Sequence, residues 1–196
     1  TEMVTGIDLV IAQLQQAVEP SLRYSQDQVM LRGWAIEARV LAEDPEAGFL
    51  PAAGEITYLR EPGGPGIRLD AALYLGMPVT ADYDSLLAKV VAWGEDRNGA
   101  IRRLRRALGE FQIGGVPTDI EFLEQIIESK SFVDGRADTT YLDSFQPIRP
   151  VGEDTLEREV ALTAALLAHQ AQVNSQPLQQ TSDNLWQMVA WREQMG

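Results

Sequence analysis

The 196-residue chain contains no cysteine and a single histidine, His169. The lack of cysteine excludes disulfides and thiolate chemistry and fits a reducing cytoplasm, the compartment that we expect. One histidine leaves no Ser–His or Cys–His dyad elsewhere in the chain and no histidine-rich metal site. The carboxylates follow neither an EF-hand loop nor another metal-ligand spacing. We therefore expect the chain to hold no metal of its own.

Positive charge and long apolar runs are also scarce. Lys and Arg number 16 against 29 Asp and Glu, which gives a formal net charge of −13. Neutralising nucleic-acid phosphates requires a basic surface, so no nucleic-acid partner is expected. No apolar run approaches the roughly 20 residues of a membrane span. The one basic cluster, in IRRLRRALGEF, falls on the flanks of a predicted helix, and we interpret it as a solvated face: Arg102, Arg103, Arg105 and Arg106.

The run RGWAIEARVLAEDP, residues 32–45, places charges inside a predicted strand. A period of two puts Glu37 and Arg39 on one face, roughly 7 Å apart. They can form a structural ion pair, which contributes under about 1 kcal/mol. Alternatively, Arg39 keeps its donors for an anionic ligand while Glu37 holds the guanidinium in place. The strand alone leaves both open. The opposite face is predicted to be buried: Trp34, Ile36, Ala38 and Val40.

The pattern of elements predicts the fold class. Residues 54–60 and 66–75 fit two strands joined by EPGGPG, which we interpret as a hairpin turn because it lacks the Lys-Ser/Thr ending of a phosphate loop. Residues 86–93 fit either a buried strand or a short helix capped by Asp84. Helices precede and follow these strands. The order predicts an α+β domain in which an antiparallel sheet carries helices on one face.

Capping residues mark where helices begin. Thr5 with Asp8, and Thr118 with Glu121, have the spacing of capping boxes. Asp96 is placed to cap the arginine-bearing helix. These three signals predict the starts of the N-terminal, the long and the following helix.

The composition changes near residue 147. Residues 155–173 are rich in helix formers, a polar stretch comes next, and LWQMVAW lies near the end. That run would expose an apolar patch if it had no partner. We predict a domain over residues 1–146 and a helical tail or linker over 147–196 that leads toward a following domain.

Seven stretches, taken in order, resemble the C-terminal subdomain of biotin carboxylase, the ATP-dependent component of acetyl-, propionyl- and methylcrotonyl-CoA carboxylases and of pyruvate carboxylase. The resemblance runs from Thr1 to about Phe145. The stretches are TEMVTGIDLV, LRGWAIEARVLAEDP, FLPAAGEIT, PGGPGIRLD, YDSLLAKVVAWG, AIRRLRRALGEF and GGVPTDIEFL.

The resemblance implies roles for particular residues. At the position of Arg39 the family has an arginine that binds bicarbonate and the ureido oxygen of biotin and stabilises the biotin enolate, which is oxyanion stabilisation by a preorganised donor. Glu37 is our candidate for orienting it, an inference from their shared strand face. Tyr83 and Asp84 match a YDS motif close to the biotin site. Arg68 matches a residue of the family's dimer interface, so a homodimer is expected.

The resemblance also implies missing parts. ATP and Mg²⁺ are bound mainly by an upstream ATP-grasp domain, and biotin is carried on a carrier domain; neither is expected within these 196 residues. The tail resembles the segment that succeeds biotin carboxylase in long α-subunits. We therefore expect a fragment of a multidomain acyl-CoA carboxylase that works with a carboxyltransferase component and is inactive alone.

Two other functions remain open from the residues. The chain can be a non-catalytic interaction module that keeps the fold for assembly and binds a partner through LWQMVAW. It can also belong to a related carboxylate–amine ligase with a similar C-terminal subdomain. ATP-dependent chemistry without biotin would distinguish the second of these from a biotin carboxylase.

Overall fold

The computed structural model divides into two compact units, Thr1–Ile148 and Arg149–Gly196. In the second unit residues 160–168 form an exposed helix, as the composition of the tail predicts. The structure describes residues 1–19, 21–148 and 160–168. His169 and the LWQMVAW run lie outside the described residues. Within those ranges no helix is long and apolar enough to cross a membrane.

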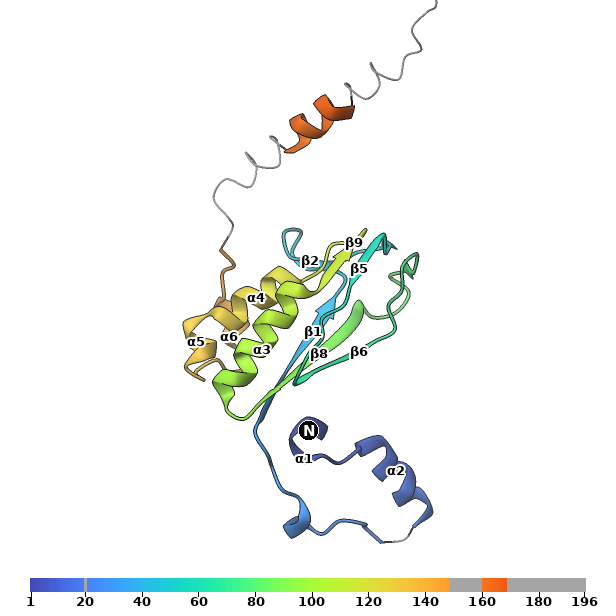
Figure 1. Cartoon of the computed structure of the whole chain (residues 1–196), viewed down its shortest axis with the longest axis vertical. Helices are drawn as coiled ribbons and strands as arrows, with labels where there is room; N and C mark the ends of the chain where they lie inside the picture. Colours follow the sequence, from blue (N-terminus) through green and yellow to red (C-terminus); the bar gives the residue numbers. More distant parts are fainter. Residues whose placement is uncertain (20, 149–159, 169–196) are drawn as a thin grey trace, which may run out of the picture. The chain divides into compact units, whose positions relative to one another are not determined.

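A three-stranded antiparallel sheet organises the first unit, in the order β1-β8-β6 (Figure 1). The strands are β1 (Trp34–Leu41), β8 (Leu86–Gly94) and β6 (Ile67–Ala71). Short two-stranded ladders flank it: β2 (Glu43–Asp44) with β3 (Leu50–Pro51), β4 (Gly54–Glu55) with β7 (Pro78–Val79), and β5 (Tyr58–Arg60) with β9 (Gln112–Gly114).

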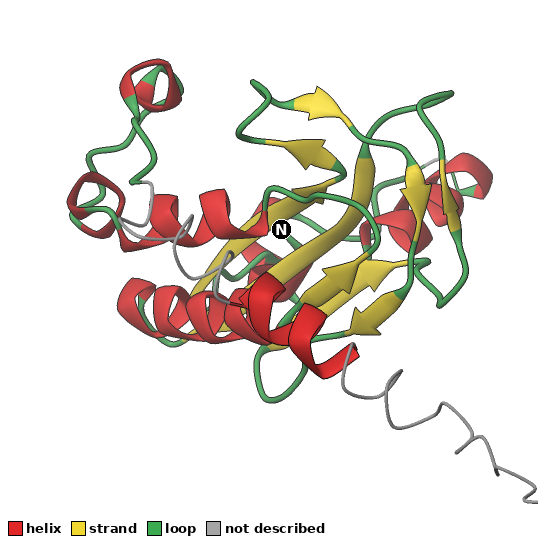
Figure 2. Cartoon of the chain, turned by 90° about the horizontal axis from the view of Figure 1, so that it is seen from above, coloured by secondary structure: helices red, strands yellow, loops and turns green. Residues whose placement is uncertain are grey.

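Two helices, α3 (Arg97–Glu110) and α4 (Ile120–Glu128), pack on one face of this sheet (Figures 1 and 2). The shared core joins Val40 and Val90 of the sheet to Leu104 of α3, all fully buried. Alternation places these strand residues inward, so the predicted fold class is confirmed. The remaining helices are short or exposed: α1 (Glu2–Thr5), α2 (Leu9–Val18), the 3₁₀ turn Gln26–Gln28, α5 (Lys130–Val133) and α6 (Tyr141–Ser144).

The predicted hairpin across EPGGPG is wrong. β5 pairs with β9 and β6 pairs with β8, so the turn carries the chain from one ladder to another. Pro62 and Pro65 lack the backbone donors that a continuing ladder needs. Gly64 and Gly66 have φ of 104° and 76°, a region that favours glycine, and they redirect the chain.

The ambiguous run over residues 86–93 is a strand, β8, the central strand of the sheet. Its Ala88, Val90 and Ala92 are buried against the helices, which fits a strand with one covered face. Asp84 therefore caps no helix. Its Oδ1 accepts a long hydrogen bond from Leu86 N at 3.4 Å.

Of the predicted helix caps, only Asp96 is confirmed: its Oδ1 accepts a hydrogen bond from Gly99 N at 2.6 Å, at the start of α3. Thr5 belongs to α1, and the next helix is capped by Asp8, which accepts from Ile11 N at 2.9 Å. Thr118 does not cap α4 either. The N-cap position belongs to Asp119, whose side chain is used elsewhere.

Asp96→Ala is expected to lower the free energy of unfolding by about 1 kcal/mol, because it leaves an orphan donor at the start of a core helix. Urea denaturation measures the effect. Asp8→Ala is the matched control, since it removes the same kind of cap from a helix that has no buried residue. An Asp96→Ala variant no less stable than the Asp8→Ala variant would contradict the prediction.

Candidate functional site

The face of the sheet turned away from α3 and α4, here called the open face, carries most of the predicted site. Glu37 and Arg39 are exposed on it, while Ala38 between them is buried, as the alternation predicts. The β1–β8–β6 register arranges the open face in two cross-strand rows. One row is Glu37, Val91 and Arg68; the other is Arg39, Lys89 and Asp70.

Trp34 departs from the prediction of a buried face, with 54% of its surface exposed. It is the first residue of β1 and pairs with Gly94, the last residue of β8. The chain turns there into α3, so the helix gives little cover to this end of the strand.

Arg39 holds no partner in the described part of the chain. None of the ion pairs and hydrogen bonds of that part includes its guanidinium, and none joins it to Glu37. The structural ion pair is therefore not formed. The planar guanidinium, which offers five donors, lies exposed on the open face. Such a fork suits a ligand with two acceptor oxygens.

Arg68, in contrast, is neutralised by two carboxylates. Its Nε donates to Asp70 Oδ1 at 2.7 Å, and its Nη1 donates to Glu2 Oε2. These contacts raise the pKa of Arg68 above its usual value, Asp70 more than Glu2. The hydrogen bond from Arg68 also lowers the pKa of Glu2. The pair attaches α1 to the edge of the open face.

Tyr83 and Asp84 lie in the loop just before β8, at the end of the sheet where β1 finishes, since Leu41 pairs with Leu86. Tyr83 is 91% exposed. No hydrogen bond among the described residues links either of them to Arg39. The structure thus brings Glu37, Arg39 and Arg68 onto one face and places the other two at its end.

Lys89 is a site residue that the sequence-based prediction missed. It is half-buried on the open face and is the direct cross-strand partner of Arg39. Alternation along LLAKVVAW could have predicted on which face of the sheet Lys89 lies, but only after that run had been assigned as a strand. Its position beside Arg39 depends on the β1–β8 register, which no local pattern in the sequence reveals.

Asp119 was also missed, and it is the one buried charged residue among those that the structure describes, 4% exposed. Its Oδ1 accepts a hydrogen bond from Leu41 N at 2.8 Å, which ties the start of α4 to the end of β1. Burial is the main reason that its pKa is raised to about 6, and the negative charge of Glu43 contributes to this rise, while backbone hydrogen bonds such as that from Leu41 N oppose it. Glu43 itself accepts a hydrogen bond from Ser85 Oγ at 2.5 Å.

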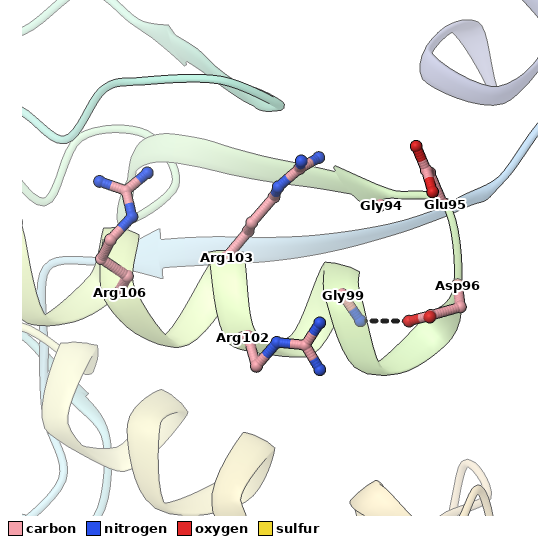
Figure 3. Close-up of a pocket in the computed structure, with 7 residues that line it drawn as sticks. All are labelled: Gly94, Glu95, Asp96, Gly99, Arg102, Arg103 and Arg106. Atoms are coloured by element: carbon pink, nitrogen blue, oxygen red, sulfur yellow. Dashed lines mark hydrogen bonds between the residues drawn. The ribbon is translucent and has the colours of Figure 1, made fainter.

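Three residues of the arginine cluster, Arg102, Arg103 and Arg106, line an open hollow of about 440 Å³ at the start of α3 (Figure 3). Arg103 donates to Trp93 O at 2.6 Å, and Arg106 donates to Gly63 O at 2.9 Å and to Glu110. The cluster does lie on the outer flanks of the helix, but these two side chains also hold β8 and the EPGGPG turn against it. Among the described residues no group of acidic or histidine side chains could hold a metal ion.

The sequence profile described as "Biotin carboxylase C-terminal domain" matches residues 37–144. The chain belongs to the biotin carboxylase C-terminal domain family. A biotin carboxylase of Nostoc sp. is 47% identical over 142 residues, which are 72% of this chain and 32% of that protein. The 2-oxoglutarate carboxylase small subunit of Hydrogenobacter thermophilus is 40% identical over 86% of this chain and 36% of its own length.

Solved structures of biotin carboxylase domains share this fold. The biotin carboxylase domain dimer of the Hydrogenobacter thermophilus enzyme, in complex with MgADP, ADP and bicarbonate, superposes with a TM-score of 0.70 at 43% identity, covering 72% of this chain and 31% of that one. Rhizobium etli pyruvate carboxylase superposes with a TM-score of 0.71 at 41% identity, over 79% and 16% of the two chains. The chain spans about a third of the length of the curated relatives it matches.

Proposed function

We propose that this chain forms one wall of a biotin carboxylase active site, where biotin is carboxylated from bicarbonate at the expense of ATP, in the cytoplasm. The main support is the Arg39 guanidinium, which lies on the open face of a biotin carboxylase domain and has no partner among the residues that the structure describes. ATP and Mg²⁺ would be bound mainly by an ATP-grasp domain of the complete polypeptide. Biotin would arrive on a carrier domain and would be carboxylated as a substrate at the site that this chain helps to form.

Arg39 fits the part that the resemblance implies. Its exposed fork of donors can hold the ureido oxygen of biotin and an oxygen of bicarbonate, and it stabilises the negative charge that develops on the ureido oxygen. The donors need no release from an internal partner before they bind. Glu37 lies on the same strand face, roughly 7 Å along the strand. It would orient the guanidinium once both are covered, and Tyr83 with Asp84 would border the biotin.

Transfer of ¹⁴C from labelled bicarbonate to free biotin tests the proposal in the complete polypeptide. Labelled product is expected only when ATP, Mg²⁺ and biotin are all present. The 196-residue chain alone is expected to form none, since it would hold one wall of the site. Labelled product formed without biotin would reject the proposal. It would also be rejected if the chain binds a protein partner while the complete polypeptide forms no labelled biotin.

The acceptor that finally receives the carboxyl group is proposed to be an acyl-CoA. Support comes from the resemblance of the tail to long α-subunits of acyl-CoA carboxylases. The relatives include carboxylases named for pyruvate and 2-oxoglutarate. These two compounds therefore serve as the competing acceptors when the acyl-CoA assignment is tested. With the carboxyltransferase component added, transfer to acetyl-CoA or propionyl-CoA is expected, and transfer to pyruvate or 2-oxoglutarate alone would overturn this choice.

Arg68→Glu is expected to weaken a homodimer of the complete polypeptide at least about tenfold, because a reversed charge at an interface is unfavourable for groups that complement an arginine. Sedimentation equilibrium measures the dissociation constant. Glu2→Gln is the control: it breaks the ion pair within the chain without reversing the charge of Arg68. Equal dissociation constants for the wild type and Arg68→Glu would place this residue outside the interface.

A further inference from the structure

A second cation lies beside Arg39 on the open face. Lys89 is its direct partner across the β1–β8 ladder, so the two side chains leave the sheet on the same side. The Cβ atoms of opposed residues are about 4.5–5.5 Å apart, and like charges at that separation destabilise a sheet. Val91 and Trp93, both half-buried, come after Lys89 on this face and keep part of it apolar.

The carboxylates near Lys89 are engaged elsewhere or set apart. Asp70 is its partner on the other side, but that carboxylate accepts the 2.7 Å hydrogen bond from Arg68 Nε. Glu37 sits in the next row, opposite Val91. In the part of the chain that the structure describes, no ion pair or hydrogen bond engages the Lys89 ammonium group.

Two adjacent positive charges thus lack a direct ion-pair partner among the described residues, in a chain whose formal net charge is −13. Of the acidic residues that the structure describes, none forms an ion pair with either cation. The repulsion between Lys89 and Arg39 would be relieved by an anion bound between them. An ammonium group supplies a compact charge and a guanidinium supplies a planar fork, a combination suited to a small oxyanion.

We propose that Lys89 and Arg39 together bind one small oxyanion of the carbonate class. Lys89 is the second donor of this site, and its role deepens the proposed function, on which the identification of the anion as bicarbonate rests. Arg68 holds one carboxylate oxygen of Asp70, the acidic residue opposite Lys89. The site is made of three neighbouring strands, so it is preformed in the 196-residue chain.

Binding can be measured directly on this chain, which contains only two lysines, Lys89 and Lys130. Reductive methylation with ¹³C labels both side chains and the N-terminal amine while keeping their positive charge. Sodium bicarbonate is then titrated at constant ionic strength against sodium chloride. The Lys89 signal is expected to shift and saturate, and the Lys130 signal to stay in place. Arg39→Gln is expected to weaken the saturable shift.

Turnover provides the second measurement, made on the complete polypeptide. Lys89→Gln is expected to raise the KM for bicarbonate by about tenfold or more, the loss typical of one charge-assisted hydrogen bond. The KM for ATP is expected to stay within about twofold. Lys89→Arg is expected to restore most of the affinity for bicarbonate. Lys130→Gln, at an exposed position of α5, is the matched control and is expected to behave as wild type.

The outcomes separate this proposal from the proposed function. If bicarbonate shifts the Lys89 signal selectively but the complete polypeptide carboxylates no biotin, the anion site is supported and the proposed function is rejected. If the complete polypeptide carboxylates biotin and Lys89→Gln leaves the KM for bicarbonate unchanged, the proposed function is supported. The role of Lys89 is then overturned, whether or not its NMR signal shifts with bicarbonate. Equal shifts of Lys89 and Lys130 also overturn it, since they would show unspecific binding.

Discussion

Arg39→Ala in the complete polypeptide is expected to slow biotin carboxylation by about 10²–10³-fold, equivalent to about 3–4 kcal/mol of barrier. The guanidinium is the preorganised donor for charge that develops on biotin, and alanine offers no substitute. The fold should survive, because Arg39 is exposed and holds no partner among the described residues. The rate of ¹⁴C transfer to biotin and the urea midpoint are measured on the same preparation.

Two further variants sharpen this test. Arg39→Lys keeps the charge but loses the bidentate fork, so it is expected to recover only a small part of the rate. Arg60→Ala removes an exposed arginine from β5, outside the three-stranded sheet, and is expected to leave the rate unchanged. Equal rates for Arg39→Ala and Arg60→Ala would show that Arg39 takes no part in the reaction.

Asp119 is expected to make stability fall as the pH rises. Its pKa is about 6 in the folded chain against 3.8 for an ordinary aspartate, so between these values the folded state binds more protons than the unfolded state. The contribution of the neutral carboxyl is therefore fully present below about pH 4 and is lost as the pH passes about 6. A shift of this size corresponds to about 3 kcal/mol, roughly half of it lost above about pH 5.

Asp119→Asn separates this contribution from those of other groups. The asparagine carbonyl oxygen can still accept the hydrogen bond from Leu41 N, and it carries no charge to desolvate. Urea unfolding from about pH 5 to 8 is expected to show the variant gaining on the wild type by about 1–2 kcal/mol. Asp134→Asn, at an exposed position, serves as the control. Parallel stability curves for the wild type and Asp119→Asn would refute the prediction.

Local patterns predicted the elements whose stability is local. The period of two in β1, except at its first residue Trp34, and the apolar stripe of α3 together with its Asp96 cap are confirmed because neighbouring residues decide them. The predictions that were wrong concern features that depend on contacts between segments far apart in the sequence. Thr118 and Glu121 have the spacing of a capping box, yet Asp119 takes the N-cap position and binds Leu41, far away in the sequence.

The site was predictable to a similar degree. Alternation alone put Glu37 and Arg39 on one face, and the exposure of both confirms that placement. Lys89 and Asp70 join them only through the β1-β8-β6 register, which depends on how three separate segments pair. The chemistry assigned to Arg39 came from the family resemblance, since an exposed arginine on a sheet has no function that its position alone reveals.

ATP-dependent carboxylation of biotin is the activity that this domain is proposed to serve. Its most direct test is the ratio of carboxylated biotin to ADP formed by the complete polypeptide, measured with ¹⁴C-bicarbonate. ADP formation is expected to rise when biotin is added, with labelled biotin produced in step with ADP. ADP formed at the same rate without biotin, and no label on biotin when it is present, would contradict this activity and favour the carboxylate–amine ligase.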